Sequence, residues 1–279
     1  MAQEQEPQGH DREPGGPPTL DLAGARATLR LNRPRQHNRL EPGDLIILRR
    51  LLDAVDAAPG VRVLVLAATG RSFSAGYHLG AVASAAGATG AAGAAGIEDS
   101  AAGQNAFEGL CQRMEAVRVP TICALQGSVY GGATDLALAC DFRLGVTGMQ
   151  MFMPAARLGL HYYPSGLSRY VTRLGLGAAK RLFLTGQTIG AEEMLRIGFL
   201  DELLAPAELE PRVEALALLL AAQAPLAVAG MKRALNEIAR AALDLPATRA
   251  AIAATLASAD IREGIQAMAE GRPPSFTGR

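Results

Sequence analysis

The chain has 279 residues, 49% of them hydrophobic, and its formal net charge is +0 at pH 7. This composition is typical of a globular protein and unlike that of a disordered chain. The neutral balance provides no electrostatic footprint for nucleic acid. No apolar stretch reaches the roughly 18–20 residues of a membrane span. We therefore expect neither nucleic acid nor a membrane as a partner.

The first residues are polar and rich in glycine, proline and charge. They lack the basic start and apolar core of a signal peptide, so we expect a disordered leader over 1–19. The three cysteines, Cys111, Cys123 and Cys140, have no metal-ligand spacing. We expect buried free thiols, no metal site and a reducing, cytoplasmic location.

The first part of the chain alternates between strand and helix patterns. A short strand at 27–31 is followed by leucines at helical spacing over 43–58. The next run, 61–68, is almost entirely apolar, as in a strand covered on both faces. Further strands are predicted at 121–126, 141–146 and 149–153, with a helix at 131–139 between the first two.

Helical patterns dominate from residue 165 onward, interrupted by a short strand at 199–204. The alternation followed by helices predicts an α/β core over 20–204 and a C-terminal helical region over 205–279. The expected helices lie at 165–174, 178–184, 191–197, 206–222, 225–241 and 247–268.

Two places share the pattern of an apolar strand, a glycine-containing turn and a helix start. One turn contains Ala75, Gly76 and Tyr77, and the other contains Gly131 and Gly132. A helix N-terminus presents unpaired N–H groups, and glycine lets a ligand approach the backbone. Two such groups of N–H donors aimed at one point would form an oxyanion hole.

An Ala/Gly-rich segment covers 84–103. Repeated glycine weakens the helical preference of alanine, and we expect a mobile loop. The alternative is a plain linker within the domain.

Several separated motifs together resemble the crotonase (enoyl-CoA hydratase/isomerase) superfamily, from about residue 20 to the C-terminus. The resemblance implies a spiral of repeated ββα units with C-terminal helices that mediate trimerisation, as a homotrimer or a dimer of trimers. It also implies an acyl-CoA thioester substrate and no cofactor. The motifs are Asn32-Arg33-Pro34, Gly70 to Gly76, Gln126-Gly127 with Gly131-Gly132, Leu136 to Asp141, Leu184-Thr185-Gly186, Gly190 to Glu193 and Ser258 to Gly264.

The resemblance also implies roles for particular residues. The oxyanion donors would be the backbone N–H groups of Tyr77 and Gly132. The expected acyl-CoA site comprises Ala75, Gly76, Tyr77, His78, Leu79, Gly80, Gly131 and Tyr163.

The chain departs from the family where a hydratase carries two glutamates. Asp135 stands in place of the first and remains a candidate general base. Its alternative role is a charge at a helix N-terminus. Ala155 stands in place of the second, and alanine cannot transfer a proton.

The segment His161-Tyr162-Tyr163 is also unusual for the family. These side chains are able to donate hydrogen bonds or transfer protons, and we select Tyr162 and His161 as candidate catalytic residues. The alternative is an aromatic packing cluster. His78 stands where relatives carry Asp, and it has either a role near the ligand or a structural one.

Three functions follow. The first is an enzyme of the enoyl-CoA hydratase/isomerase type, which stabilises a thioester enolate in the oxyanion hole. The second is a decarboxylase, or another lyase or hydrolase, acting on a substituted acyl-CoA. The third is a non-catalytic acyl-CoA-binding protein.

Overall fold

The computed structural model describes residues 15–78 and 106–279. A six-stranded sheet has the order β1-β2-β3-β4-β6-β9. Its first two strands are antiparallel and the remaining neighbours are parallel. The strands are β1 (Thr19–Ala23), β2 (Arg26–Leu31), β3 (Val63–Ala68), β4 (Thr121–Leu125), β6 (Phe142–Val146) and β9 (Glu202–Leu204).

A second, three-stranded sheet has the order β5-β7-β8. It contains β5 (Val129–Tyr130), β7 (Gln150–Phe152) and β8 (Ile189–Gly190). Strand β5 follows β4 in the chain, and β7 follows β6, so the chain passes from the large sheet to the small one twice.

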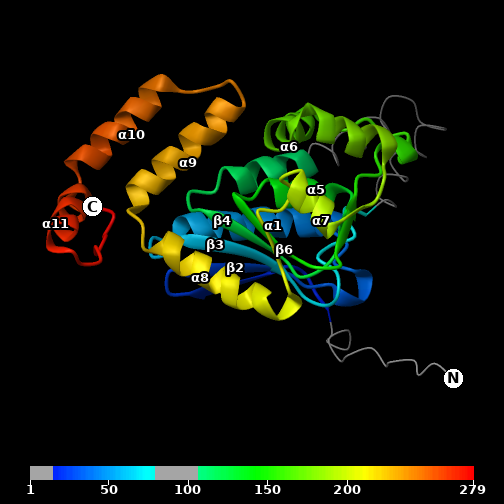
Figure 1. Cartoon of the computed structure of the whole chain (residues 1–279), viewed down its shortest axis with the longest axis horizontal. Helices are drawn as coiled ribbons and strands as arrows, with labels where there is room; N and C mark the ends of the chain where they lie inside the picture. The colour runs from blue at the N-terminus through cyan, green and yellow to red at the C-terminus, as the bar shows by residue number, and fades with distance from the viewer. Residues whose placement is uncertain (1–14, 79–105) are drawn as a thin grey trace.

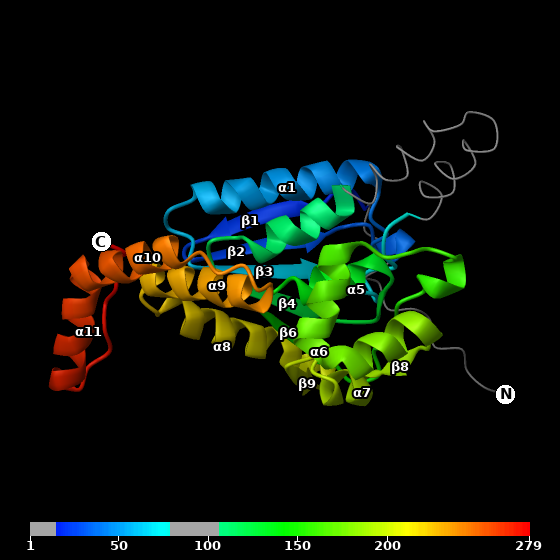
Figure 2. The same cartoon turned by 90° about the horizontal axis from the view of Figure 1, so that it is seen from above.

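Helices cover both faces of the large sheet (Figure 2). The helix α1 (Pro42–Ala57) lies on one side, and α8 (Leu209–Ala221) packs against β3, β4 and β6 on the other. Every residue of β3 is buried, as predicted for a strand covered on both faces. The remaining core helices are an unlabelled helix over 106–115, α5 (Gly132–Leu138), α6 (Pro164–Thr185) and α7 (Ala191–Arg196).

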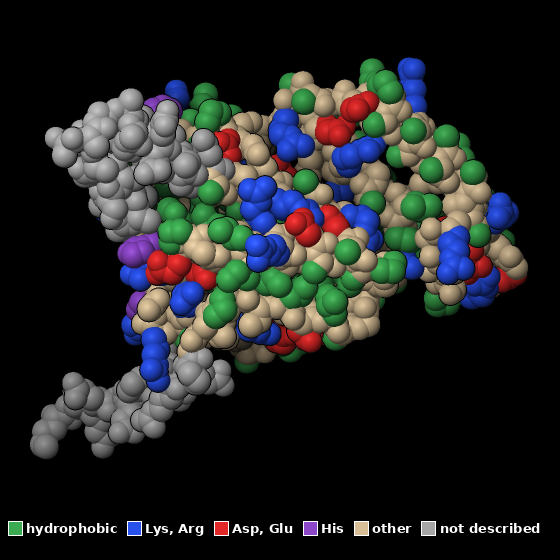
Figure 3. All heavy atoms as spheres, turned by 180° about the vertical axis from the view of Figure 1, so that it is seen from behind, with side chains coloured by type: hydrophobic (Ala, Val, Ile, Leu, Met, Phe, Trp, Pro, Cys, Tyr) green, Lys and Arg blue, Asp and Glu red, His purple; other side chains and the backbone are tan. Residues whose placement is uncertain are grey.

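The last three helices extend from one end of the core (Figure 1). They are α9 (Pro225–Ala239), α10 (Leu245–Ala257) and α11 (Ala259–Glu270). Charges of both signs are interspersed on the face in Figure 3. Within the described ranges, no single helix has the length and apolar composition to cross a membrane, although the pair Pro206–Ala221 and Pro225–Ala239, bent by 106°, meets both criteria together.

Most expected elements are confirmed, with three differences. The single helix expected over 247–268 is wrong, because Ser258 has an extended ψ of 159° and its Oγ accepts a hydrogen bond from the N–H of Ile261. The chain therefore ends α10 and begins α11 there. The short strands β1, β5 and β8 were not predicted. Helix α6 spans both expected helices, with a break at Gly175, where φ is 80°.

The described part of the expected leader already joins the fold, since Thr19 pairs with Arg30. The rest of the leader, at 1–14, and the whole Ala/Gly segment lie outside the described residues. Cys111, Cys123 and Cys140 are buried and free, as expected.

The turn after β4 packs directly against the turn after β3. A Cβ atom on Gly127 would lie 2.1 Å from the backbone oxygen of Arg71. The Gln126 side chain donates from Nε2 to the backbone oxygens of Gly70 and Ser72, both at 3.1 Å. Only glycine allows the two backbones to approach this closely.

We expect Gly127→Ala to lower the free energy of unfolding by about 1–3 kcal/mol, the usual cost of overpacking. Urea unfolding followed by circular dichroism would measure the change. Gly43→Ala is the matched control, since Gly43 is an exposed residue of α1 with open space around an added Cβ. The control should be neutral or slightly stabilising. Equal stability of the two variants would contradict the steric argument.

Candidate active site

The two glycine turns meet at the N-terminus of α5. Tyr130 donates its N–H to the backbone oxygen of Ser74 over 2.9 Å. Gly76 has a φ of 91°, and a Cβ there would lie 2.6 Å from the oxygen of Tyr130 and 3.4 Å from the nitrogen of Gly132. The structure thus brings together the two turns that the sequence singled out.

The N–H groups of Tyr77 and Gly132 lie outside the backbone hydrogen bonds of the neighbouring β-bridge and of helix α5. In the β-bridge between Leu40 and Tyr77, the backbone oxygen of Gly76 accepts from the Leu40 N–H at 2.9 Å. The His78 N–H donates to the backbone oxygen of Leu40 at 3.0 Å. Gly132 is the first residue of α5, and a first-turn N–H has no intrahelical acceptor. Their use as oxyanion donors stays a prediction.

A cavity of about 330 Å³ opens at this junction, and its walls are mainly aromatic and apolar. Six predicted site residues line it: Ala75, Tyr77, Gly131, Gly132, Tyr162 and Tyr163. Sequence reasoning missed Phe107, Tyr130, Phe152, Met153, Pro154, Arg157, Leu158 and Leu160 as lining residues. These residues carry no spacing signal that separates them from ordinary core or loop positions.

Of the remaining predicted residues, Gly76, His78, Asp135 and His161 do not line the cavity. Gly76 lies behind its wall, while Leu79 and Gly80 fall outside the described residues. The exposed His161 has its Nδ1 2.9 Å from the backbone oxygen of Tyr162, so that nitrogen carries the donated hydrogen. His78 pairs through Nδ1 with Glu41 Oε2 at 2.7 Å.

Glu41 is shared between two basic side chains. Burial opposes its ionisation, but hydrogen bonds from Arg39 and His78 outweigh burial and lower the pKa of its carboxyl. His78 is thereby held by a carboxylate rather than directed into the cavity, which agrees with the structural alternative for this residue.

Asp135 is fully buried and does not line the cavity. Its Oδ1 accepts from Arg169 Nη1 at 2.6 Å, and its Oδ2 accepts a short hydrogen bond from the hydroxyl of Tyr163. Arg169 also lies 3.5 Å, Nε to Oε1, from the buried Glu115. Both oxygens of Asp135 are therefore occupied, and the Tyr163 side chain connects it to the cavity.

The two tyrosines are neutral donors. Burial is the main cause that raises the pKa of the Tyr162 and Tyr163 hydroxyls well above the ordinary value, and the charge of Asp135 adds to it. Burial alone would lower the pKa of Arg169, but the charges of Asp135 and its neighbours raise it. Ala155 lines the cavity and contributes only a methyl group.

We expect Arg169→Met to lower the free energy of unfolding by about 3–5 kcal/mol, because it leaves the Asp135 carboxylate buried without its partner. Adding Asp135→Asn to the same chain should restore part of the loss. The control is Arg212→Met, which breaks the ion pair between Arg212 and Glu202. These two side chains are 40% and 31% exposed, so the loss of unfolding free energy should be much smaller. Equal destabilisation by the two single variants, measured by urea unfolding, would contradict the prediction.

Comparisons with known proteins agree with this geometry. A family model described as enoyl-CoA hydratase/isomerase matches residues 23–279. The crotonyl-CoA hydratase of Syntrophomonas wolfei is 32% identical over 253 residues, which cover 90% of this chain and 94% of that protein. The carnitinyl-CoA dehydratase of Escherichia coli is 32% identical over 232 residues, 79% of this chain and 83% of that protein.

A crystal structure of an enoyl-CoA hydratase from Bacillus anthracis superimposes with a TM-score of 0.83 at 26% sequence identity. The match covers 95% of this chain and 100% of that one. The expected crotonase-like α/β fold with C-terminal helices is confirmed. The chain belongs to the enoyl-CoA hydratase/isomerase family of the crotonase superfamily, and it is an enzyme of that type.

Proposed function

We propose that this enzyme binds an acyl-CoA thioester with its carbonyl oxygen between the N–H groups of Tyr77 and Gly132, and that it stabilises the enolate formed there. The observation that carries the proposal is the meeting of two glycine turns at one apolar cavity. The names of its relatives, a crotonyl-CoA hydratase and a carnitinyl-CoA dehydratase, favour the same class of substrate.

The proposed hole acts on charge that develops during the reaction. The oxygen of a neutral thioester becomes negative in the enolate, and preoriented N–H donors then interact with it more strongly. Loss of one such donor typically costs about 2.7–4 kcal/mol of transition-state stabilisation. Because the donors are backbone groups, this step requires no metal or redox cofactor.

Asp135 is the proposed acceptor of the substrate proton, and it acts from behind the cavity wall. Tyr163 lies between its carboxylate and the cavity, and Tyr162 donates to Tyr163. His161 is exposed and outside the lining, so the proposed proton path runs through the two tyrosines rather than through His161.

A second candidate is decarboxylation, or another lyase or hydrolase step, on a substituted acyl-CoA. Enolate stabilisation serves carbon–carbon cleavage as well as hydration. The observation that favours it is the absence of a carboxylate among the described lining residues, where Ala155 replaces the second glutamate. A non-catalytic acyl-CoA-binding protein would bind a broad panel of thioesters and convert none of them.

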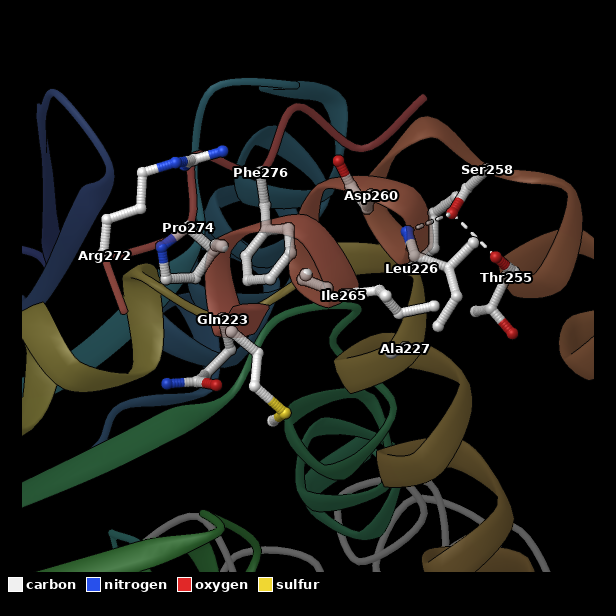
Figure 4. A pocket seen from close by; sticks show the side chains of 15 residues that line it. Gln223, Leu226, Ala227, Thr255, Ser258, Asp260, Ile265, Arg272, Pro274 and Phe276 are labelled. Atoms are coloured by element: carbon white, nitrogen blue, oxygen red, sulfur yellow. Dashed lines mark hydrogen bonds between the residues drawn. The ribbon is translucent and has the colours of Figure 1, made fainter. Parts of the chain in front are cut away.

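We also propose a homotrimer, alone or as a dimer of trimers, assembled through the C-terminal helices. Large apolar side chains on these helices are exposed, including Leu235, Leu256, Ile265 and Met268. Beside them, a cavity of about 570 Å³ has mainly apolar walls that include Leu226, Ile265 and Phe276 (Figure 4). Such a surface on an isolated chain favours a protein partner, and the buried free thiols fit a cytoplasmic enzyme.

The thioester proposal predicts that the carbonyl contributes to binding. We expect an S-alkyl-CoA thioether, which lacks the carbonyl oxygen, to bind about 5- to 150-fold more weakly than the matching thioester, since it loses two hydrogen bonds of about 0.5–1.5 kcal/mol each. Isothermal calorimetry would measure both dissociation constants. The carbonyl stretch of the bound thioester should also move to lower frequency.

Free CoA is the control for contacts outside the acyl group. Equal affinity of thioester and thioether, with an unshifted carbonyl stretch, would contradict the proposed hole. Turnover of a panel of enoyl-CoA and carboxyacyl-CoA substrates then separates the candidate reactions.

The assembly proposal predicts that sedimentation velocity detects trimers or hexamers of the natural chain. The double variant Ile265→Glu/Met268→Glu should sediment as a monomer, because it places charges on an apolar contact; these side chains are 65% and 85% exposed. Ile46→Glu, on α1 and 58% exposed, is the matched control and should leave the assembly intact. A monomeric natural chain would contradict the proposal.

A further inference from the structure

Two consecutive tyrosines line the cavity at the glycine turns. The rings of Tyr162 and Tyr163 stack with 4.2 Å between centroids and 27° between planes. The Tyr162 hydroxyl donates to the Tyr163 hydroxyl over 3.0 Å. A Cβ on Gly166 would lie 2.4 Å from the Tyr162 ring and 2.7 Å from the Tyr163 ring. Because Gly166 has no side chain, the first turn of α6 has room for the stacked pair of rings.

The hydrogen bonds continue from this pair into the protein. The Tyr163 hydroxyl donates to Asp135, and it also lies 3.6 Å from the Sγ of Cys111. A hydroxyl has a single proton, and a bond to a carboxylate is stronger than one to sulfur. The proton of Tyr162 thus points to Tyr163, and the proton of Tyr163 points to Asp135.

This order of donors connects the cavity to a carboxylate that does not line it. Asp135 is fully buried, and its other oxygen is held by Arg169. The tyrosine hydroxyls resist ionisation, because burial and the charge of Asp135 raise their pKa. A transfer that moves all the protons together avoids forming a phenolate.

The surroundings of Arg169 allow Asp135 to become neutral. Glu115, 7% exposed, lies 3.5 Å from the Nε of Arg169 through its Oε1. If Asp135 gains a proton, the buried guanidinium therefore keeps a negative partner. An unpaired buried charge would otherwise make the transfer costly.

We propose that this enzyme moves protons between the bound thioester and Asp135 through the hydroxyls of Tyr162 and Tyr163. The inference rests on the proposed function. The bond between the α-carbon and its hydrogen breaks, and its electron pair enters the enolate. The hydrogen, as a proton, joins the Tyr162 oxygen while the Tyr162 proton passes to Tyr163 and the Tyr163 proton passes to Asp135. Negative charge moves from Asp135 to the enolate oxygen.

The roles of the residues then differ. Tyr162 contacts the substrate and is the catalytic residue, whereas Tyr163 and Asp135 act through it and Arg169 orients Asp135. Return of the proton to another carbon would isomerise the substrate, and exchange with water would release the label from a labelled substrate. The relay therefore suits substrates with an acidic hydrogen beside the thioester carbonyl.

The test is tritium wash-out from the 2-position of labelled butyryl-CoA, which requires enolate formation and exchange of the removed hydrogen with water, and no further step of the reaction. We expect Tyr162→Phe, Tyr163→Phe and Asp135→Asn each to slow wash-out by about 100-fold or more, the usual size of an acid–base contribution. The dissociation constant for butyryl-CoA, measured by calorimetry, should stay unchanged. In the natural enzyme, the rate in mixtures of light and heavy water should follow a curved dependence on deuterium content, since several protons move together.

Tyr170→Phe is the matched control. Tyr170 is also a buried tyrosine, on α6, and its hydroxyl pairs with Thr134 without lining the cavity. This variant should retain wash-out. Equal loss in Tyr170→Phe would indicate a structural effect and overturn the relay.

The relay would also be overturned if Tyr162→Phe, Tyr163→Phe or Asp135→Asn washed out tritium as fast as the unmodified enzyme. A wash-out rate that depends linearly on the deuterium content of the water would overturn it as well. These outcomes leave acyl-CoA binding intact. Failure of the natural protein to bind any acyl-CoA would instead overturn the proposed function, together with the inference that rests on it.

Discussion

The contact between the turns after β3 and β4 is the constraint on which the rest of the site depends. Adjacent parallel strands end at the same edge of the sheet, and both chains must turn there in the same small volume. Gly127 lets its backbone lie against Arg71, and Gln126 holds the first turn with two hydrogen bonds. This approach brings Gly76 beside the start of α5 and opens a cavity between the turns.

A buried set of charges connects that cavity to the surrounding helices. Asp135 on α5, Arg169 on α6 and Glu115 on the helix over 106–115 form continuous ion pairs. Arg240, directly after α9, reaches Glu115 at 3.1 Å. Buried charges are costly unless paired, so each member constrains where its partners and their helices lie. The C-terminal helical region is thereby connected through side chains to Asp135, which lies behind the cavity wall.

The sequence predicted the fold well where local patterns match the environment. The apolar run of β3 and the leucine spacing of α1 are both visible without tertiary information. The prediction of one helix over 247–268 was wrong, because no glycine or proline near Ser258 marks an end of the helix in the sequence. The break depends on the serine cap and on the fold-back of the C-terminal tail, in which Asp260 accepts from the N–H groups of Thr277 and Gly278.

By itself, the sequence determined the family, the two glycine turns and the departures at Asp135 and Ala155, because backbone geometry and residue type are local properties. Only the tertiary structure decided what those side chains contact. Asp135 lies behind the wall with both oxygens occupied, while Tyr163 lies at the cavity. That arrangement arises where α5, α6 and the helix over 106–115 pack together, and contacts between segments so far apart in the chain leave no periodic signal in the sequence.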